Sequence, residues 1–221
     1  TQQRIKYLNL HNQRTLSDNN LILNLQKSAK IYQKYVDKDV LIIYAHSKKG
    51  PFFPYQFHAG KEHFQHLAGV KSPNGAKWFY ERCLDISSPL KRKEIVPKDS
   101  IKNTSSKIAV LPNALDLTQS KAYKLGNKNL ITLNNSFSMA LGNTQHILGF
   151  DKRNYYLPIP VTTLNRSIFE FCTQVNTIYL IMVKSVSEPQ YSTIFYEITK
   201  NILHKADFDS DILNLIDKKI L

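Results

Sequence analysis

Residues 55–70 read YQFHAGKEHFQHLAGV, and this segment gives the clearest indication of the fold. Up to Gly60 it alternates between apolar and polar side chains, a pattern typical of a strand. After Gly60 apolar residues recur every third position, which favours a helix. The segment therefore predicts a strand that runs directly into a short helix. His63 and His66 would then lie on nearly the same face of that helix.

The residues on either side of this segment predict helices and one further strand. Residues 17–36 show the spacing of an amphipathic helix, with Ser17 or Asp18 as its N-cap. Residues 40–45 form an apolar run of strand length, and residues 74–85 predict a second helix. Residues 88–107 read as a basic connector, and residues 105–117 as one helix broken at Pro112 or as two short pieces.

From residue 121 onward the pattern changes to short strands separated by Asn, Gly and Asp. The predicted strands are residues 121–126, 129–133, 136–141, 146–150, 155–159, 177–185 and 191–200. Helices are predicted at 163–171 and 209–221. Helices followed by a mostly antiparallel sheet indicate the α+β class. We divide the chain into an N-terminal helical extension (1–39), a central domain (40–200) and a C-terminal helix (201–221), packed together as one compact domain.

The composition indicates a soluble protein with a polyanionic partner. The chain has 221 residues, 42% of them hydrophobic, and a formal net charge of +13, which favours nucleic acid or an anionic membrane surface. Between residues 47 and 107 there are twelve Lys and Arg against five Asp and Glu, so the charge is concentrated around the histidines. Cys83 and Cys172 lack metal-ligand spacing and read as buried thiols of a cytoplasmic protein, and residues 1–10 lack a signal peptide's apolar core.

Several kinds of chemistry lack their usual motifs. His58, His63 and His66 have no nearby cysteine and no His-Glu-x-x-His pattern, so no metal site is predicted. A phosphate-binding Gly-rich loop and a Gly-x-Ser-x-Gly elbow are also missing from the sequence. The remaining candidate is general acid–base chemistry on a phosphodiester without a cofactor.

Such chemistry needs a proton carrier, positive charge and hydroxyl groups around the phosphate. Histidine titrates near neutral pH and can act as acid or base. The segment at 55–70 supplies histidines and Lys61, while the C-terminal hairpin supplies Lys184 and a run of hydroxyl side chains. That run consists of Tyr191, Ser192 and Thr193.

An ordered set of segments resembles a phage-associated family of the barnase–EndoU–colicin–RelE-like nuclease group. The segments are FQHLAGV at 64–70, WFYERCL at 78–84, LGF at 148–150, YLP at 156–158, TLN at 163–165, IMVK at 181–184 and YSTIFY at 191–196. The resemblance extends from about residue 40 to 200. It implies N-terminal helices packed on a four- to five-stranded antiparallel sheet. It also implies a metal-independent RNase of the kind found in toxins, prophage effectors and phage-defence systems.

The resemblance further implies a set of site residues. His66 matches the histidine of a His-Leu-x-Gly motif and would be the general acid or base. Lys184 would stabilise the phosphorane, and Ser192 and Thr193 would hold the phosphate. His63, Lys61, Arg82 and Tyr191 are secondary candidates, and the basic cluster Lys91, Arg92 and Lys93 is the predicted RNA-binding surface.

Two other functions use the same sequence features. A non-catalytic nucleic-acid-binding or regulatory protein would need the basic surface but no proton carrier. A protein–protein role, such as toxin inhibition, fits the positive charge less well. The expected partners are RNA, with tRNA as one candidate, and an antitoxin or immunity protein; no membrane partner is expected.

Overall fold

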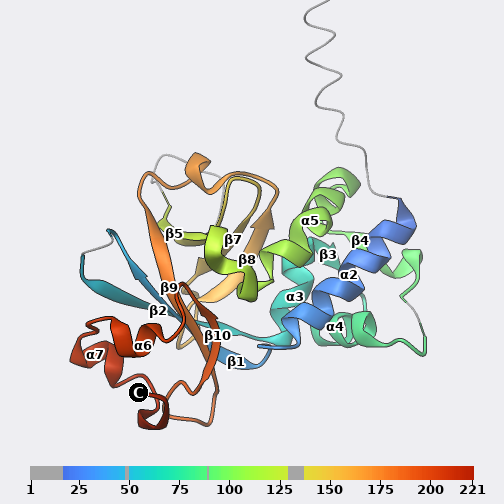
Figure 1. Cartoon of the computed structure of the whole chain (residues 1–221). Helices are drawn as coiled ribbons and strands as arrows, with labels where there is room; N and C mark the ends of the chain where they lie inside the picture. Colours follow the sequence, from blue (N-terminus) through green and yellow to red (C-terminus); the bar gives the residue numbers. More distant parts are fainter. Residues whose placement is uncertain (1–16, 48–49, 89, 129–136) are drawn as a thin grey trace, which may run out of the picture.

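A computed structural model describes residues 17–47, 50–88, 90–128 and 137–221 (Figure 1). The α-helices in these ranges are α2 (Asp18–Tyr32), α3 (Lys61–Ala68), α4 (Ala76–Leu84), α5 (Ile101–Ala114), α6 (Ile202–Lys205) and α7 (Ser210–Leu213). The strands are β1 (Lys38–Ala45), β2 (Phe52–Ala59), β3 (Val70–Lys71), β4 (Val96–Pro97), β5 (Lys124–Asn127), β6 (Met139–Gly142), β7 (Ile147–Asp151), β8 (Ile159–Leu164), β9 (Val175–Ser185) and β10 (Thr193–Glu197). The α+β class is confirmed, as is the strand-to-helix transition at residues 55–70.

The main sheet is antiparallel and larger than the sequence analysis implied. Its order is β2-β1-β9-β5-β6-β7-β8, and β10 adds to β9 off this path. The expected number of four to five strands was too low. Strands β5 to β8 extend the sheet as a meander of short antiparallel strands. A separate two-stranded ribbon joins β3 to β4.

The sheet curls until its two ends meet. The backbone N–H of His58, in β2, donates a 2.8 Å hydrogen bond to the carbonyl of Pro158, just before β8. Because the twist accumulates from strand to strand, the first and last strands of such a sheet can approach each other. This contact brings the segment between β7 and β8 beside β2.

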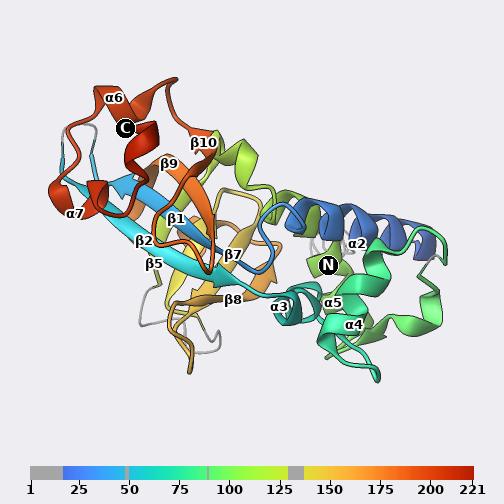
Figure 2. The same ribbon diagram turned by 90° about the horizontal axis from the view of Figure 1, so that it is seen from below.

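The sheet is covered on both faces, by different parts of the chain. Helices α2 to α5 gather at one end of the molecule, and α6 and α7 lie at the other (Figures 1 and 2). On the helical side, the apolar stripe of α2 joins the main core through Leu21, Leu25 and Tyr32. A second cluster on the opposite face joins β1 and β9 to the C-terminal segment. Its buried members are Leu41, Ile43, Leu180, Met182, Tyr191, Ile202, Leu203, Phe208, Ile212 and Ile216.

Local side-chain bonds explain where two helices begin. Ser17, rather than Asp18, caps α2 by accepting the Asn20 N–H. Ser100 caps α5 in the same way, so the predicted connector at 88–107 was wrong from Ile101 onward. Pro112 lies in the last turn of α5, and the helix continues past it to Ala114, so the predicted break is absent.

Three further predictions need correction in the C-terminal half. Of the strand predicted at 155–159, residues 155–158 form no strand, and β8 starts only at Ile159. Because β8 continues to Leu164, the first residues of the helix predicted at 163–171 belong to a strand instead. Of the helix predicted at 209–221, only α7 and a terminal 3-10 turn form. The helix is interrupted because the Tyr191 N–H donates to the Leu215 carbonyl and the Asp217 N–H donates to the Tyr191 carbonyl. The strand predicted at 129–133 lies outside the described residues.

The described residues also bear on the two cysteines and on membrane-spanning helices. Cys83 and Cys172 are buried free thiols, as predicted. In the ranges that the structure describes, no helix has the length and apolar character needed to cross a membrane.

Candidate active site

The strand register places three ionisable side chains in one row across the sheet. Asp39 of β1 is paired with His58 of β2 on one side and with Lys184 of β9 on the other. Directly paired residues project from the same face of a sheet, so the three side chains lie next to each other. Leu41, two residues along β1, belongs to the C-terminal cluster, so the row lies on the face that the C-terminal segment covers.

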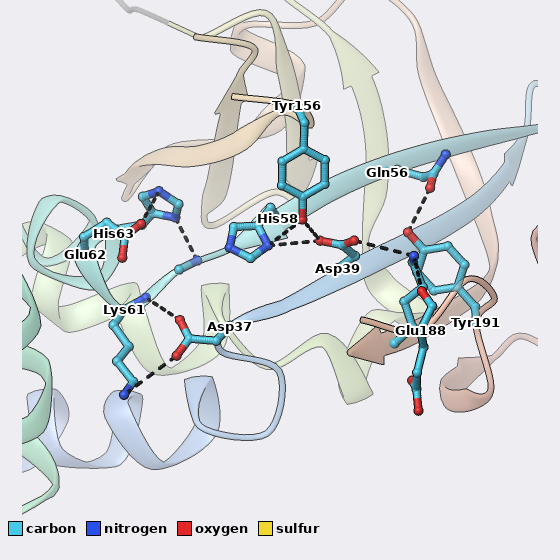
Figure 3. Close-up of polar contacts among 12 residues, drawn as sticks. Asp37, Asp39, Gln56, His58, Lys61, Glu62, His63, Tyr156, Glu188 and Tyr191 are labelled. Carbon is cyan, nitrogen blue, oxygen red and sulfur yellow. Dashed lines mark hydrogen bonds and ion pairs between the residues drawn. The ribbon is translucent and has the colours of Figure 1, made fainter. Parts of the chain in front are cut away.

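Asp39 is the centre of this row. Only 3% of the residue is exposed, and its carboxylate is 3.0 Å from His58 Nδ1 and 3.8 Å from Lys184 Nζ. The hydroxyl of Tyr156 also donates to Asp39 (Figure 3). A buried carboxylate is tolerated where cations and hydrogen-bond donors surround it. Asp39 therefore holds His58, Lys184 and Tyr156 in place around itself.

The bond to Asp39 determines which nitrogen of His58 is available. Because a carboxylate only accepts, Nδ1 carries the hydrogen, and the lone pair of Nε2 is left for another group. Figure 3 shows Nε2 on the side of the ring away from Asp39, turned toward α3. The His58 side chain is 15% exposed. The side chain is thus oriented as a general base would be, with Nδ1 held by Asp39 and Nε2 available to accept a proton.

Tyr156 reaches the row because the sheet curls. Its hydroxyl lies 3.1 Å from His58 Nδ1 in addition to its bond to Asp39. Burial, and then the hydrogen bond to Asp39, raise the pKa of Tyr156 well above its ordinary value. The phenol therefore stays protonated at neutral pH and acts as a hydrogen-bond donor.

Lys184 is oriented by the hairpin that follows it. Its side chain is 14% exposed and donates a 2.7 Å bond to the carbonyl of Glu188. Its Nζ also lies 5.4 Å from the ring centroid of Tyr191, whose hydroxyl donates to Gln56 in β2. The ammonium group is thus fixed in place beside Asp39.

His63 lies on α3 next to this row. Its Nδ1 accepts the Gly60 N–H at 2.9 Å, and its ring centroid is 6.3 Å from that of His58. Burial lowers the pKa of His63 to about 4, with further lowering from the cationic forms of His58, His66 and Arg153 and an opposing effect from Glu62. His63 is therefore neutral near pH 7, with its hydrogen on Nε2.

His66, the first choice from the sequence, is one turn further along α3 and exposed. Its Nδ1 lies 3.4 Å from Lys98 Nζ, and it lines a pocket together with His63. Burial, followed by the charges of Lys98, Arg153 and Lys107, lowers the pKa of His66. No hydrogen bond or ion pair among the described residues joins His66 to Lys184, Ser192 or Thr193.

The two predicted hydroxyl residues differ in position. Thr193 is paired with Val183, so its side chain projects from the face opposite to that of Lys184. Ser192 comes just before β10 and is half-buried. The predicted roles of His66, Lys184, Ser192 and Thr193 stay predictions.

The secondary candidates have structural partners. Lys61 forms ion pairs with Asp37 and Glu81, and Arg82 forms them with Glu94 and Asp85. Of the basic cluster, Arg92 bonds Asp18 at 2.7 Å, while Lys91 and Lys93 are exposed.

Asp39, His58 and Tyr156 are site residues that the sequence patterns did not predict. His58 was recognised as one of three clustered histidines, but its partner Asp39 is identified by strand register and its partner Tyr156 by the curl of the sheet. A single acid at the start of the apolar run DVLIIYA was the one available signal for Asp39. Across the described residues, no three His, Cys, Asp or Glu side chains gather as a metal ion would require.

Comparison with known proteins gives one match. A family model described as phage-Barnase-EndoU-ColicinE5/D-RelE like nuclease 4 matches residues 24–200. That range includes every residue of the row and begins earlier than the resemblance noted from the sequence. Neither curated proteins nor solved structures gave a match.

Proposed function

The chain belongs to this nuclease family, and on that premise we propose that it is a metal-independent endoribonuclease that leaves 2′,3′-cyclic phosphate ends. The observation that supports this most directly is the row Lys184–Asp39–His58, set by strand register and completed by Tyr156. It combines a proton carrier, a fixed cation and a hydroxyl donor within a few ångströms.

His58 is the proton carrier in this proposal. Its Nε2 takes the proton from the ribose 2′-hydroxyl as that oxygen attacks phosphorus. Asp39 keeps the imidazole in the required tautomer and stabilises the imidazolium that forms, as a buried carboxylate does in a hydrolase triad. The bond between phosphorus and the 5′-oxygen then breaks, the 5′-oxygen takes up a proton from water, and the His58 imidazolium returns its proton to water.

Lys184 and Tyr156 provide the electrostatic contribution. Negative charge builds up on the phosphorane oxygens, and fixed donors aimed at developing charge lower the barrier. Lys184 places a positive charge beside Asp39, and the protonated Tyr156 donates its O–H to Asp39, which helps to hold that carboxylate against His58. The net charge of +13 would attract the RNA backbone. The proposed substrate is RNA, with tRNA as one candidate. The proposed setting is a toxin or phage-defence system in the cytoplasm, with an antitoxin or immunity protein as partner.

The test uses a labelled single-stranded RNA in the presence of EDTA. We expect cleavage without divalent ions, cyclic phosphate at the new 3′ ends, and protection of a cleavage site that carries a single 2′-deoxy substitution. His58→Ala should lower kcat by about 10²–10⁴-fold. His204→Ala, at an exposed histidine on α6, is the matched control and should retain full activity.

His66→Ala in the same assay decides between the two histidines. A loss of kcat in His66→Ala with full activity in His58→Ala would return the catalytic role to the residue chosen from the sequence. Intact RNA at high protein concentration, together with binding that weakens steeply with salt, would instead support a nucleic-acid-binding protein without catalysis.

A further inference from the structure

A pocket of about 370 Å³ opens between α3 and the segment that joins β7 to β8. Resting on the proposed RNase function, we propose that this pocket binds one unpaired nucleotide of the RNA, next to the phosphate that is cleaved. Tyr155 would stack on the base, and the basic residues at the rim would bind the phosphate. The aromatic and basic side chains that line the pocket are His63, His66, Lys71, Lys98, Arg153 and Tyr155.

The described residues that line the pocket carry more positive than negative charge. Lys71, Lys98 and Arg153 line it, and none of the ion pairs among the described residues involves any of the three. Glu62 is the one acidic side chain among the described residues of the lining. Unpaired cations around a concave surface favour an anionic ligand, and a phosphodiester is the anion that the proposed reaction provides.

An unsatisfied donor also points to a ligand. The Nε2 of His63 is buried and has no hydrogen-bond partner, while Nδ1 is used by the Gly60 N–H. Its closest carboxylate oxygen, in Glu62, is 3.7 Å away, which is too far for a hydrogen bond. Buried donors are nearly always paired in folded proteins. An acceptor oxygen or ring nitrogen of a bound nucleotide would satisfy this one.

Tyr155 gives the pocket an aromatic wall. It is 39% exposed and meets the His63 ring with a centroid separation of 5.5 Å. An exposed aromatic ring beside cations is the usual platform for an unpaired base, because each base has a face that can stack. A base inside a duplex is not free to reach such a wall. The arrangement therefore selects single-stranded RNA or a loop.

The pocket and the catalytic row are continuous. Tyr155 contacts His63, and its neighbour Tyr156 contacts Asp39 and His58. The His58 and His63 rings are 6.3 Å apart, and His58 Nε2 faces α3 (Figure 3). A nucleotide held by His63 and Tyr155 would thus leave its neighbouring phosphate near the proposed base.

The experiment measures binding separately from cleavage. A 2′-O-methyl RNA tetramer has no free 2′-hydroxyl and cannot be cleaved by the proposed route, so fluorescence anisotropy at low salt reports affinity alone. We expect Kd to rise about tenfold in Tyr155→Leu, which removes one stacked base, and by a similar factor in Lys98→Gln. The same four nucleotides held in a duplex, as part of the stem of a stable 2′-O-methyl hairpin, should bind at least about tenfold more weakly than the single strand.

Matched controls separate the pocket from general effects of charge and hydrophobicity. Lys218→Gln removes one exposed lysine from the C-terminal segment, and Phe169→Leu removes an exposed aromatic ring. Both should bind like the wild type. Equal affinity of all four variants, or equal affinity for duplex and single strand, would overturn the proposal. If RNA is cleaved but binding does not depend on Tyr155, only the pocket fails; if binding depends on Tyr155 but RNA is never cleaved, only the RNase function fails.

Discussion

The buried imidazole of His63 should make the protein less stable in acid. Its pKa is lowered from about 6.5 to about 4, chiefly by burial, so the unfolded chain binds this proton more readily than the folded one. The stabilisation is complete above the unfolded pKa and is lost as the pH falls toward 4. From the two pKa values, the free energy of unfolding should drop by about 2 kcal/mol between pH 7 and about pH 5 on account of this group alone.

His63→Gln isolates this contribution. His63 is the third residue of α3 and accepts the Gly60 N–H, a position where Gln is a common capping residue. The variant should therefore keep the cap while losing the titrating group. Glu62, His58, His66 and Arg153 are the charged or titratable neighbours that influence His63, and all four are retained.

The measurement is urea unfolding of both proteins at pH 7 and at about pH 5, with His204→Gln as the control at an exposed histidine. The acid-induced loss of stability should be smaller in His63→Gln by about 2 kcal/mol and unchanged in the control. If the two proteins lost the same free energy on acidification, His63 would not be a buried neutral imidazole. The donor assigned to Nε2 would then be lost as an argument for the nucleotide pocket.

Three further substitutions test the assignments around the proposed catalytic row. Tyr156→Phe should lower kcat for RNA about tenfold without changing the far-UV circular dichroism, because it removes one donor to a buried carboxylate; wild-type kcat would show that the hydroxyl is not needed. Arg82→Met should lower the free energy of unfolding by about 2 kcal/mol in urea titrations, since it leaves the partly buried Glu94 unpaired, and should keep kcat; a kcat effect without a stability effect would restore its predicted catalytic role. Thr193→Val should keep kcat within about twofold, because the side chain is on the face away from Lys184; a larger loss in steady-state assays would contradict that orientation.

Local patterns in the sequence predicted α2, β1, β2, α3 and α4 near their observed bounds. The change of period at Gly60 identified both β2 and α3, and the stripe of α2 identified the face that it buries. These features depend on residues a few positions apart, whose geometry is fixed by helix and strand periodicity. The family resemblance was recognised from an ordered series of such short segments and is confirmed by the match over residues 24–200.

The arrangement of the site depended on contacts that periodicity does not encode. Asp39, His58, Tyr156 and Lys184 come from four parts of the chain and meet through strand register and the curl of the sheet. A register shift of one residue would turn these side chains to the other face, so the sequence alone does not identify the row. Tyr156 was assigned to a strand, because its local sequence does not reveal that it would bridge the two ends of the sheet.

The last twenty-one residues have a consequence for how this protein can be divided. They lie beyond the family match, yet they bury Leu41 and Met182 and hold the main chain of Tyr191 through Leu215 and Asp217. A fragment that ended at residue 200, where the family match ends, would expose the apolar surface of the sheet to solvent. It would also free the Tyr191 ring, which lies next to the Lys184 ammonium group. Residues 201–221 thus complete the folded structure although they lie outside the family match, and a peptide of these residues, added in trans to the shortened chain, would test how far they stabilise it.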